Sequence, residues 1–255
     1  MTKKLLFRLP NWLGDVCMAL PVVRAIQKKH RSAEFAFLVQ PQYIALLDKL
    51  AIEGEKIALP EKNWRYYLNC LKLRRQFDAQ VLFTNSERGD MEAFLIGSKK
   101  RYGITRPGKP RKLITHPYPL SAEFDEESLH QTFLWRDFTA AFHLHDGIDL
   151  SPAYPVSTVK KSAVGLICGS ANTPEKRWPM ANWQALIAAL LARGVARIVL
   201  IGSHADKAVC DEIKQHFAEK QVENWAAKTN LAELTDLLRQ LDLVIGNDTG
   251  GLHIA

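Results

Sequence analysis

Three short segments place polar and charged side chains where an apolar run ends and a helical pattern begins. They are residues 9–15, 169–179 and 246–253. In a doubly wound α/β fold the carboxyl ends of parallel strands meet at one edge of the sheet, and ligands bind along that edge. The three segments are therefore the predicted places for catalytic and ligand-binding groups.

The first segment contains one carboxylate, Asp15, which follows Gly14 in the first turn of a predicted helix. A carboxylate at this place can remove a proton from a hydroxyl group as a general base. It can also complement the positive end of the helix dipole, which stabilises a helix by about 0.3–1 kcal/mol. Position alone favours the second interpretation. Glu87 and Asp90 are alternative carboxylates near a strand end and would contact an acceptor or solvent.

The second segment, residues 169–179, is a small polar loop that also contains Lys176 and Arg177. Backbone N–H groups and hydroxyls in such a loop can bind an anion, and the two cations add attraction. The loop lacks the glycine spacing of a P-loop or of a dinucleotide fingerprint. By itself it indicates only a phosphate-binding loop.

The third segment brings Thr249, Gly250 and Gly251 to the start of a predicted helix. Bare backbone amides and a hydroxyl at a helix N-terminus are suited to a diphosphate. His253 would face the same ligand about one turn further on. A helix cap followed by a tight turn has the same composition, so this alternative stays open. Residues 201–203 end a further predicted strand at the same edge.

Metal ligands and disulfides are not predicted. No Asp-X-Asp pair follows a strand, the histidines lack metal-ligand spacing, and no serine lies in a nucleophile elbow. The four cysteines, at positions 17, 70, 168 and 210, are too far apart for a zinc site. They indicate free thiols in a reducing compartment.

Apolar runs alternate with helical patterns along the chain, which is typical of an α/β fold with parallel sheets. The predicted strands are residues 5–9, 35–39, 80–83, 164–168, 197–201 and 241–245. The predicted helices lie near residues 16–30, 64–76, 130–143, 181–193, 205–219 and 231–240. Residues 149–162 break both patterns and are predicted to link two domains, 1–155 and 156–255.

The formal net charge of +7 and the pI near 9.2 indicate anionic partners, whether nucleic acid, a phospholipid surface or a phosphorylated sugar lipid. Basic residues concentrate in a loop-like stretch, residues 99–112, which is either a solvated loop or an anion-facing one. The apolar run at residues 5–7 is too short for a signal peptide, and no run is long enough to span a bilayer. A cytoplasmic location is therefore expected.

Taken together and in this order, the motifs resemble those of the ADP-heptose:lipopolysaccharide heptosyltransferase family, most closely its heptosyltransferase II branch. The resemblance covers nearly the whole chain and rests on Leu9-Pro10-Asn11-Trp12-Leu13-Gly14-Asp15 with Pro21 in the next helix, on Phe77-Asp78 through Asn85-Ser86, on Lys176-Arg177-Trp178-Pro179 and on Asn247-Asp248-Thr249-Gly250-Gly251-Leu252-His253. It implies an α/β fold of GT-B type with two Rossmann-like domains. Because family members continue beyond the last motif, it also implies that the second domain is incomplete at its C-terminus.

The resemblance also assigns roles to individual residues. It implies that Asp15 is the general base and that Lys176 binds the diphosphate. The remaining implied nucleotide-sugar ligands are Asp248, Thr249, Gly250, Gly251 and His253, with Thr173 for a phosphate and Asp206 for the ribose. The implied acceptor-binding residues, in the first domain, are Asn11, Trp12, Asn85 and Ser86.

The implied reaction is an inverting transfer of heptose from ADP-L-glycero-D-manno-heptose to the inner core of lipopolysaccharide, with no metal and no cofactor. The implied partners are ADP-heptose, a lipid A–Kdo or heptose acceptor and, transiently, the cytoplasmic face of the inner membrane. The basic stretch 99–112 would then face the anionic acceptor. A GT-B transferase for another nucleotide sugar and a non-catalytic nucleotide- or glycan-binding remnant remain alternatives, and nucleic-acid binding is the least favoured.

Overall fold

The chain forms two compact units, unit 1 (Met1–Ser151) and unit 2 (Pro152–Ala255). The structure is a computed structural model that describes residues 3–125, 128–152, 162–170, 174–218 and 220–255. The boundary between the units falls inside the predicted linker, residues 149–162, most of which lies outside the described residues. That the first unit binds the acceptor and the second the nucleotide sugar remains a prediction.

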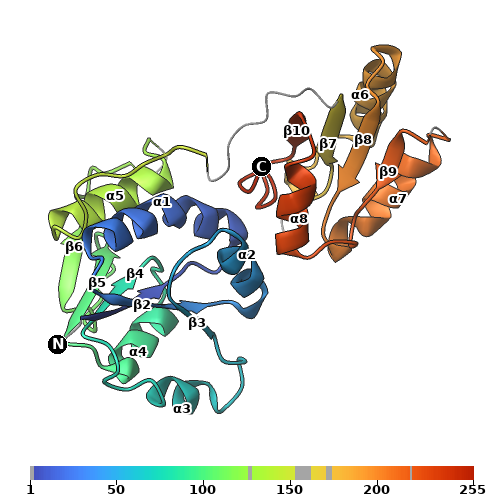
Figure 1. Cartoon of the computed structure of the whole chain (residues 1–255). Helices are drawn as coiled ribbons and strands as arrows, with labels where there is room; N and C mark the ends of the chain where they lie inside the picture. The colour runs from blue at the N-terminus through green and yellow to red at the C-terminus, as the bar shows by residue number, and fades with distance from the viewer. Residues whose placement is uncertain (1–2, 126–127, 153–161, 171–173, 219) are drawn as a thin grey trace. The chain divides into compact units, whose positions relative to one another are not determined.

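Unit 1 is built on a six-stranded sheet in which every pairing is parallel (Figure 1). Its strands are β1 (Lys4–Arg8), β2 (Glu34–Val39), β3 (Glu55–Ala58), β4 (Ala79–Leu82), β5 (Lys100–Thr105) and β6 (His116–Pro119). The spatial order is β3-β2-β1-β4-β5-β6, so the strand order reverses between β1 and β4. Ligands of doubly wound sheets bind at the carboxyl side of such a reversal, which here adjoins the loops after β1 and β4.

The helices of unit 1 cover both faces of this sheet. They are α1 (Leu13–Lys29), the short η1 (Pro41–Tyr43), α2 (Ile44–Lys49), α3 (Tyr66–Leu71), α4 (Glu87–Ile96) and α5 (Gln131–Ala141). Helices α1 and α5 pack together on one face, and α3 and α4 pack together on the other (Figure 1). Helix α4 ends at Gly97, whose φ of 72° is the left-handed conformation that commonly terminates a helix.

Strand β1 lies at the centre of the unit 1 core because its side chains are apolar on both faces. Leu6 and Phe7 are fully buried, Leu6 against one helical layer and Phe7 against the other side of the sheet. The Phe7 ring stacks on Phe37 of the neighbouring strand with ring centroids 5.2 Å apart. Burying such side chains contributes about 1.5–3 kcal/mol each, which anchors the strand that precedes residues 9–15.

Unit 2 contains a four-stranded parallel sheet in the order β10-β7-β8-β9 (Figure 1). Its strands are β7 (Ala163–Ile167), β8 (Arg197–Ile201), β9 (Val222–Asn224) and β10 (Leu243–Gly246). Its helices are η2 (Pro174–Lys176), α6 (Met180–Ala192), η3 (His204–Asp206), α7 (Lys207–Gln215) and α8 (Leu231–Leu238). Because the strands are parallel, their carboxyl ends lie at one edge, where residues 168–170, 202–203 and 247–251 follow them.

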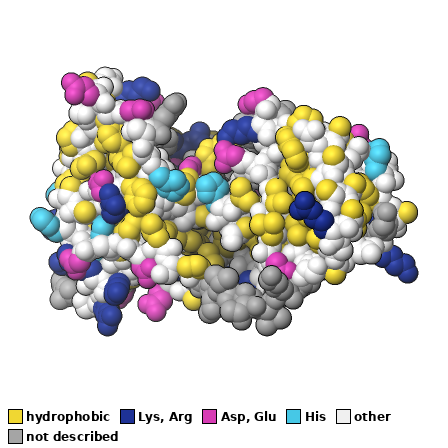
Figure 2. Space-filling view, turned by 90° about the horizontal axis from the view of Figure 1, so that it is seen from above, with side chains coloured by type: hydrophobic (Ala, Val, Ile, Leu, Met, Phe, Trp, Pro, Cys, Tyr) yellow, Lys and Arg dark blue, Asp and Glu magenta, His cyan; other side chains and the backbone are white. Residues whose placement is uncertain are grey.

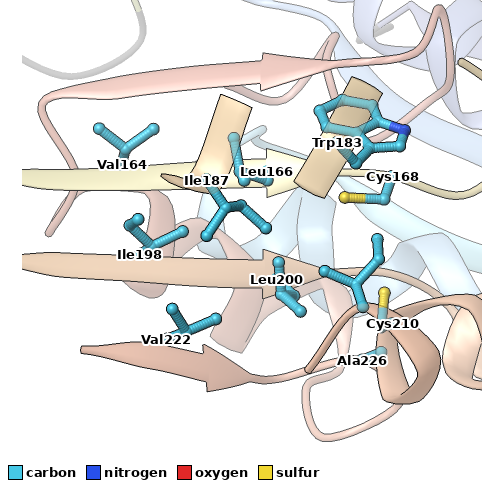
Figure 3. Close-up of a cluster of buried hydrophobic side chains, with 11 residues drawn as sticks. Val164, Leu166, Cys168, Trp183, Ile187, Ile198, Leu200, Cys210, Val222 and Ala226 are labelled. Carbon is cyan, nitrogen blue, oxygen red and sulfur yellow. The ribbon is translucent and has the colours of Figure 1, made fainter. Parts of the chain in front are cut away.

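Alternating side chains of the unit 2 strands face two separate helical layers. On one face, Leu166 and Leu200 pack with Trp183 and Ile187 of α6 and with Cys210 of α7 (Figure 3). On the opposite face the alternating strand side chains Ile167, Val199 and Ile201 pack with Leu234, Leu237 and Leu238 of α8. The two-sided apolar pattern of a buried parallel strand is therefore confirmed.

The structure confirms the predicted α/β class and all six predicted strands, each within about two residues of its expected bounds. Four strands were not predicted: β3, β5, β6 and β9. The prediction of a loop at residues 99–112 is wrong in part, because Lys100–Thr105 forms β5. The helix expected after Gly246 is also absent, since residues 250–254 form consecutive hydrogen-bonded turns.

The four cysteines are free thiols, as predicted. Burial raises the pKa of Cys17 to about 12, that of Cys70 to about 11 and that of Cys210 to about 12, and it also raises the pKa of Cys168. These thiols therefore stay protonated at neutral pH.

The surface mixes charges of both signs. On the face shown in Figure 2, acidic and basic side chains are interspersed with hydrophobic and uncharged ones. Every helix within the described ranges is too short or too polar to cross a lipid bilayer.

Candidate functional site

In unit 2 the second and third motifs meet through an ion pair between Lys176 and Asp248. The Lys176 Nζ atom lies 2.6 Å from Asp248 Oδ2, across 72 residues of sequence. The hydrogen bond and the charge of Lys176 lower the pKa of the Asp248 carboxyl, and His253, whose Nε2 lies 4.0 Å from Asp248 Oδ1, acts in the same direction. The three predicted ligands therefore stand together, with Lys176 and Asp248 both substantially exposed to solvent.

Asn247, between β10 and Asp248, joins the two motifs through its side-chain amide. Its Nδ2 donates to the carbonyls of Cys168 at 2.8 Å and Gly169 at 3.2 Å, and its Oδ1 accepts from the backbone N–H of Trp178 at 3.1 Å. Asn247 is buried, so these bonds replace its contacts with water. One side chain thus fixes the loop after β7, the segment before α6 and the loop after β10.

A pocket of about 380 Å³ opens beside Asn247. Its walls combine the basic side chains of Lys176 and Arg177 with apolar surface from Trp178, Pro179, Trp183 and Ile245, and Gly246 and Asn247 complete the lining. The Trp178 and Trp183 rings meet edge to face with centroids 5.0 Å apart, which holds the half-exposed Trp178 in place. The pocket therefore offers an apolar wall next to a cationic rim.

Asp206 lies at the same edge of the sheet but is buried. Its Oδ2 accepts from the backbone N–H of Ser203 at 2.9 Å and from the Ser203 hydroxyl at 2.6 Å, closing a capping box at the start of η3. A Cβ placed on Gly169 would lie 2.1 Å from Asp206, so only glycine lets the loop after β7 approach so closely. The structure thus gives Asp206 a local packing role, and the ribose contact remains a prediction.

The other predicted ligands of unit 2 lie in the turns after β10. Thr249 and Gly251 accept backbone hydrogen bonds from Leu252 and Ile254 at 3.0 and 3.2 Å, which folds residues 249–254 back on themselves. Gly250 lies between them, beside Asp248. Thr173 lies outside the described residues.

In unit 1 Asp15 lies in the first turn of α1, as the sequence predicted. The helix starts at Leu13, after the extended residue Trp12, whose side chain makes no capping bond and is 62% exposed. Asp15 is half-buried. The carboxylate therefore lies in the first helical turn at the carboxyl edge of the sheet, three residues after the exposed Trp12.

Asn11 is held by a buried ionic network that the sequence did not reveal. Its Oδ1 accepts from Arg8 Nη2 at 3.1 Å, and its carbonyl accepts from the Tyr43 hydroxyl at 2.9 Å. Arg8, at the end of β1, pairs with Glu92 of α4 at 2.5 Å, and the Tyr66 hydroxyl donates to the other Glu92 oxygen. The side chains of Arg8 and Glu92 are 4% and 1% exposed.

Asn85 and Ser86 follow β4 and are fixed by different partners. The Asn85 side-chain oxygen accepts from Arg111 Nη1 at 3.0 Å, and the Ser86 hydroxyl accepts from the backbone N–H of Gly89 at 3.1 Å as the cap of α4. Arg111 also clamps Asp90, with Nε 2.9 and 3.0 Å from its two carboxylate oxygens. The prediction that Asp90 contacts solvent is therefore wrong, because its carboxylate lies in a buried ion pair, and contact with an acceptor stays a prediction.

Arg8, Glu92 and Asn247 are the structurally central residues that the sequence analysis missed as site residues. Each shows a weak signal, namely a charged or amide side chain inside or directly after an apolar run. A buried charge needs a partner, so such a position is a candidate for a network. The identity of the partner, 84 residues away for Arg8, appears only in the fold.

Comparison with known proteins decides the family. Residues 72–255, well over half of the chain, match Glycosyltransferase family 9 (heptosyltransferase). The chain belongs to this family. The resemblance inferred from the motifs is thereby confirmed.

Similar proteins include lipooligosaccharide heptosyltransferase 2 of Haemophilus influenzae, which is 25% identical to this family 9 chain over 96% of the chain and 78% of the relative. Lipopolysaccharide heptosyltransferase 2 of Escherichia coli is 24% identical over 96% of the chain and 77% of the relative.

Two solved structures show the same fold. The E. coli ADP-heptose lipopolysaccharide heptosyltransferase II matches 99% of the chain and 81% of its own length, with a TM-score of 0.79 and 23% identity. The E. coli heptosyltransferase WaaC with ADP matches 98% of the chain and 83% of its own length, with a TM-score of 0.77 and 17% identity. The predicted GT-B fold with two Rossmann-like units is therefore confirmed.

Proposed function

We propose that this family 9 chain transfers heptose from ADP-L-glycero-D-manno-heptose to the inner core of lipopolysaccharide at the cytoplasmic face of the inner membrane. The observation that carries the proposal is the convergence of Lys176, Asp248 and His253 at one strand edge of unit 2. A nucleotide diphosphate needs a cation at such an edge, and Lys176 supplies it. A similar fold holding ADP supports the choice of nucleotide.

In this proposal residues 156–255 bind the donor. The diphosphate contacts Lys176 and the backbone N–H groups of residues 249–251. His253 lies on the same side and stabilises the negative charge that develops as ADP departs. Asp248 orients Lys176 through the 2.6 Å ion pair. Asp206 and Thr173 are the proposed ribose and phosphate contacts.

Residues 1–155 bind the acceptor through Asn11, Trp12, Asn85 and Ser86. Asp15 removes the proton of the acceptor hydroxyl while that oxygen forms a bond to the anomeric carbon of heptose. The bond from that carbon to the diphosphate oxygen breaks in the same step, and ADP leaves. A single displacement from the side opposite the leaving group inverts the configuration, and it needs neither metal nor cofactor.

Turnover measured with ADP-heptose, UDP-sugars and GDP-sugars tests the proposal. We expect heptose transfer only from the ADP donor, and calorimetry should give a lower Kd for ADP than for UDP or GDP. Equal or tighter binding of UDP would reject the adenine assignment. Binding of ADP without transfer to any core acceptor would instead identify a non-catalytic binding protein.

Lys176→Ala should weaken ADP binding by about 1.5–3 kcal/mol, which is the usual contribution of a hydrogen bond to a charged group. Removing the cation also leaves the exposed Asp248 carboxylate facing the diphosphate, which adds repulsion. Calorimetric titration with ADP measures the change.

The matched control is Lys214→Ala, which removes a positive charge from the far end of α7, where Lys214 donates to the Phe217 carbonyl at 2.7 Å. We expect its Kd for ADP to equal that of the wild type. Equal Kd values for both variants and the wild type would remove Lys176 from the site.

A further inference from the structure

Exposed apolar side chains of unit 1 concentrate on α3 and α4 and just before them. Trp64 is 76% exposed, Tyr67 43% and Leu68 53%, while on α4 Met91 is 38% and Phe94 51% exposed. We call these five residues the α3–α4 surface. Large apolar side chains that gather on one surface mark an interaction site more often than scattered ones do.

Helices α3 and α4 lie side by side and contact each other near both of their ends. Helix α3 packs against α4. The Arg88 guanidinium, at the start of α4, lies 5.7 Å from the centroid of the Tyr66 ring in α3. Beyond α3, the Arg75 backbone N–H donates to the Ile96 carbonyl at the end of α4 at 2.8 Å. The exposed apolar side chains therefore come from two adjacent helices that contact each other near both of their ends.

The exposed charged side chains in the segments that carry this apolar surface are mostly basic. The exposed charged residues of segment 61–75 and of α4 comprise six cations and two anions: Lys62, Arg65, Lys72, Arg74, Arg75 and Arg88 against Glu61 and Glu87. The Arg65 guanidinium lies over the Trp64 ring, 4.6 Å from its centroid. Figure 2 views the side of unit 1 that carries α1 and α5, opposite α3 and α4, and there the two signs are mixed.

The α3–α4 surface adjoins the proposed acceptor residues. Helix α4 begins directly after Asn85 and Ser86. On its inner side, Tyr66 and Glu92 hold Arg8, which in turn holds Asn11. Under the proposed function, on which this step rests, the acceptor is a lipid, so its acyl chains need a bilayer close to these residues.

We propose that the α3–α4 surface docks on the surface of an anionic phospholipid bilayer. Trp64, Leu68 and Phe94 enter the boundary between headgroups and acyl chains, and the surrounding cations contact lipid phosphates. Aromatic and aliphatic side chains combined with Lys and Arg are typical of surfaces that lie in a membrane interface. A second copy of the chain fits less well, because a two-fold interface would place these cations opposite one another.

Co-sedimentation of the full chain with vesicles tests this proposal. We expect the chain to bind vesicles of phosphatidylethanolamine and phosphatidylglycerol, and to bind phosphatidylcholine vesicles much more weakly. The double variant Trp64→Ser/Phe94→Ser should lower the partition coefficient by about tenfold or more. Lys62→Gln/Lys72→Gln should lower it by about fivefold per charge, and raised salt should weaken binding of the wild type.

The control is Leu150→Ser, which removes a similarly exposed apolar side chain of unit 1 from the segment that follows α5. It should bind vesicles as the wild type does, and all variants should keep the wild-type melting temperature. Wild-type vesicle binding by the Trp64→Ser/Phe94→Ser variant would overturn the proposal. So would a change in oligomeric state, measured by light scattering, with vesicle binding unaltered.

Transfer to a soluble, delipidated core saccharide separates this proposal from the proposed function. We expect the α3–α4 variants to turn over such an acceptor at the wild-type rate. A wild-type chain that transfers heptose but binds no vesicles would overturn docking alone. A chain that binds vesicles through this surface but transfers no heptose would support docking and reject the proposed reaction.

Discussion

Asp15→Asn is expected to lower the turnover of heptose transfer by about 10²- to 10⁴-fold, the range usual for loss of a general base. A sugar hydroxyl is a poor nucleophile at neutral pH, so a side chain must accept its proton as it attacks. Asn keeps the size of Asp and most of its hydrogen bonds but cannot take the proton. The Kd for ADP should stay nearly unchanged, since the proposed donor ligands all lie in unit 2. Steady-state kinetics and calorimetry measure the two effects separately.

The other candidate general bases in unit 1 are Asp90 and Glu87, and the structure distinguishes between them. Asp90 is clamped by Arg111 in a buried ion pair, so its replacement should act on folding. Glu87 is exposed in the first turn of α4, and Glu87→Gln is the matched control for Asp15→Asn. Wild-type turnover by Asp15→Asn together with a large loss in Glu87→Gln would show that the base is misassigned. Unfolding of Asp15→Asn would show that the carboxylate serves the helix end.

Arg8→Met is expected to destabilise unit 1 by about 3–5 kcal/mol, because it leaves the Glu92 carboxylate buried without its cation. The Arg8 side chain is 4% exposed and that of Glu92 1%, so water cannot replace the lost partner. The change should lower the urea midpoint of unfolding, followed by circular dichroism. It should also raise the KM for the acceptor, since Arg8 Nη2 holds Asn11.

Two further variants separate charge burial from packing. Arg8→Met/Glu92→Met removes both charges and should be more stable than Arg8→Met alone. Lys29→Met, which breaks the exposed pair of Lys29 with Asp146, should leave the midpoint nearly unchanged. If Arg8→Met unfolds at the wild-type midpoint, the Arg8–Glu92 pair does not stabilise unit 1.

The strands that the sequence predicted are those with apolar side chains on both faces, such as β1 and β8. Those that it missed have polar sequences: β3 reads Glu-Lys-Ile-Ala and β6 reads His-Pro-Tyr-Pro. Strands β3, β6 and β9 lie at sheet edges, where side chains are less enclosed and the apolar pattern weakens. Strand β5 lies inside the sheet but begins with Lys100 and Arg101, and this basic start resembles a solvated loop.

The candidate site was predictable at the level of its loops, and its internal contacts were not. An apolar run followed by Gly169 or by Gly246 predicts, from local composition alone, a loop at the carboxyl edge of the sheet. The Lys176–Asp248 pair and the Asn247 bonds join residues 69 to 79 positions apart, and only the strand order of unit 2 brings them together. Arg111 illustrates the opposite error. The sequence placed Arg111 in the basic, loop-like stretch 99–112, yet its guanidinium is buried against Asp90.

The low reactivity of the native cysteines makes the protein suitable for site-specific labelling. Maleimides react with thiolates, and burial raises the pKa of all four thiols, so they stay protonated at neutral pH. Cys70, Cys168 and Cys210 are also shielded from solvent, whereas Cys17 is half-buried. A cysteine introduced at an exposed position would react far faster than any of these four. Spin labels or fluorophores can therefore be attached at chosen surface positions of each unit without first removing the native cysteines. Distances between such labels in solution would then test whether the separation of unit 1 and unit 2 changes when donor or acceptor binds.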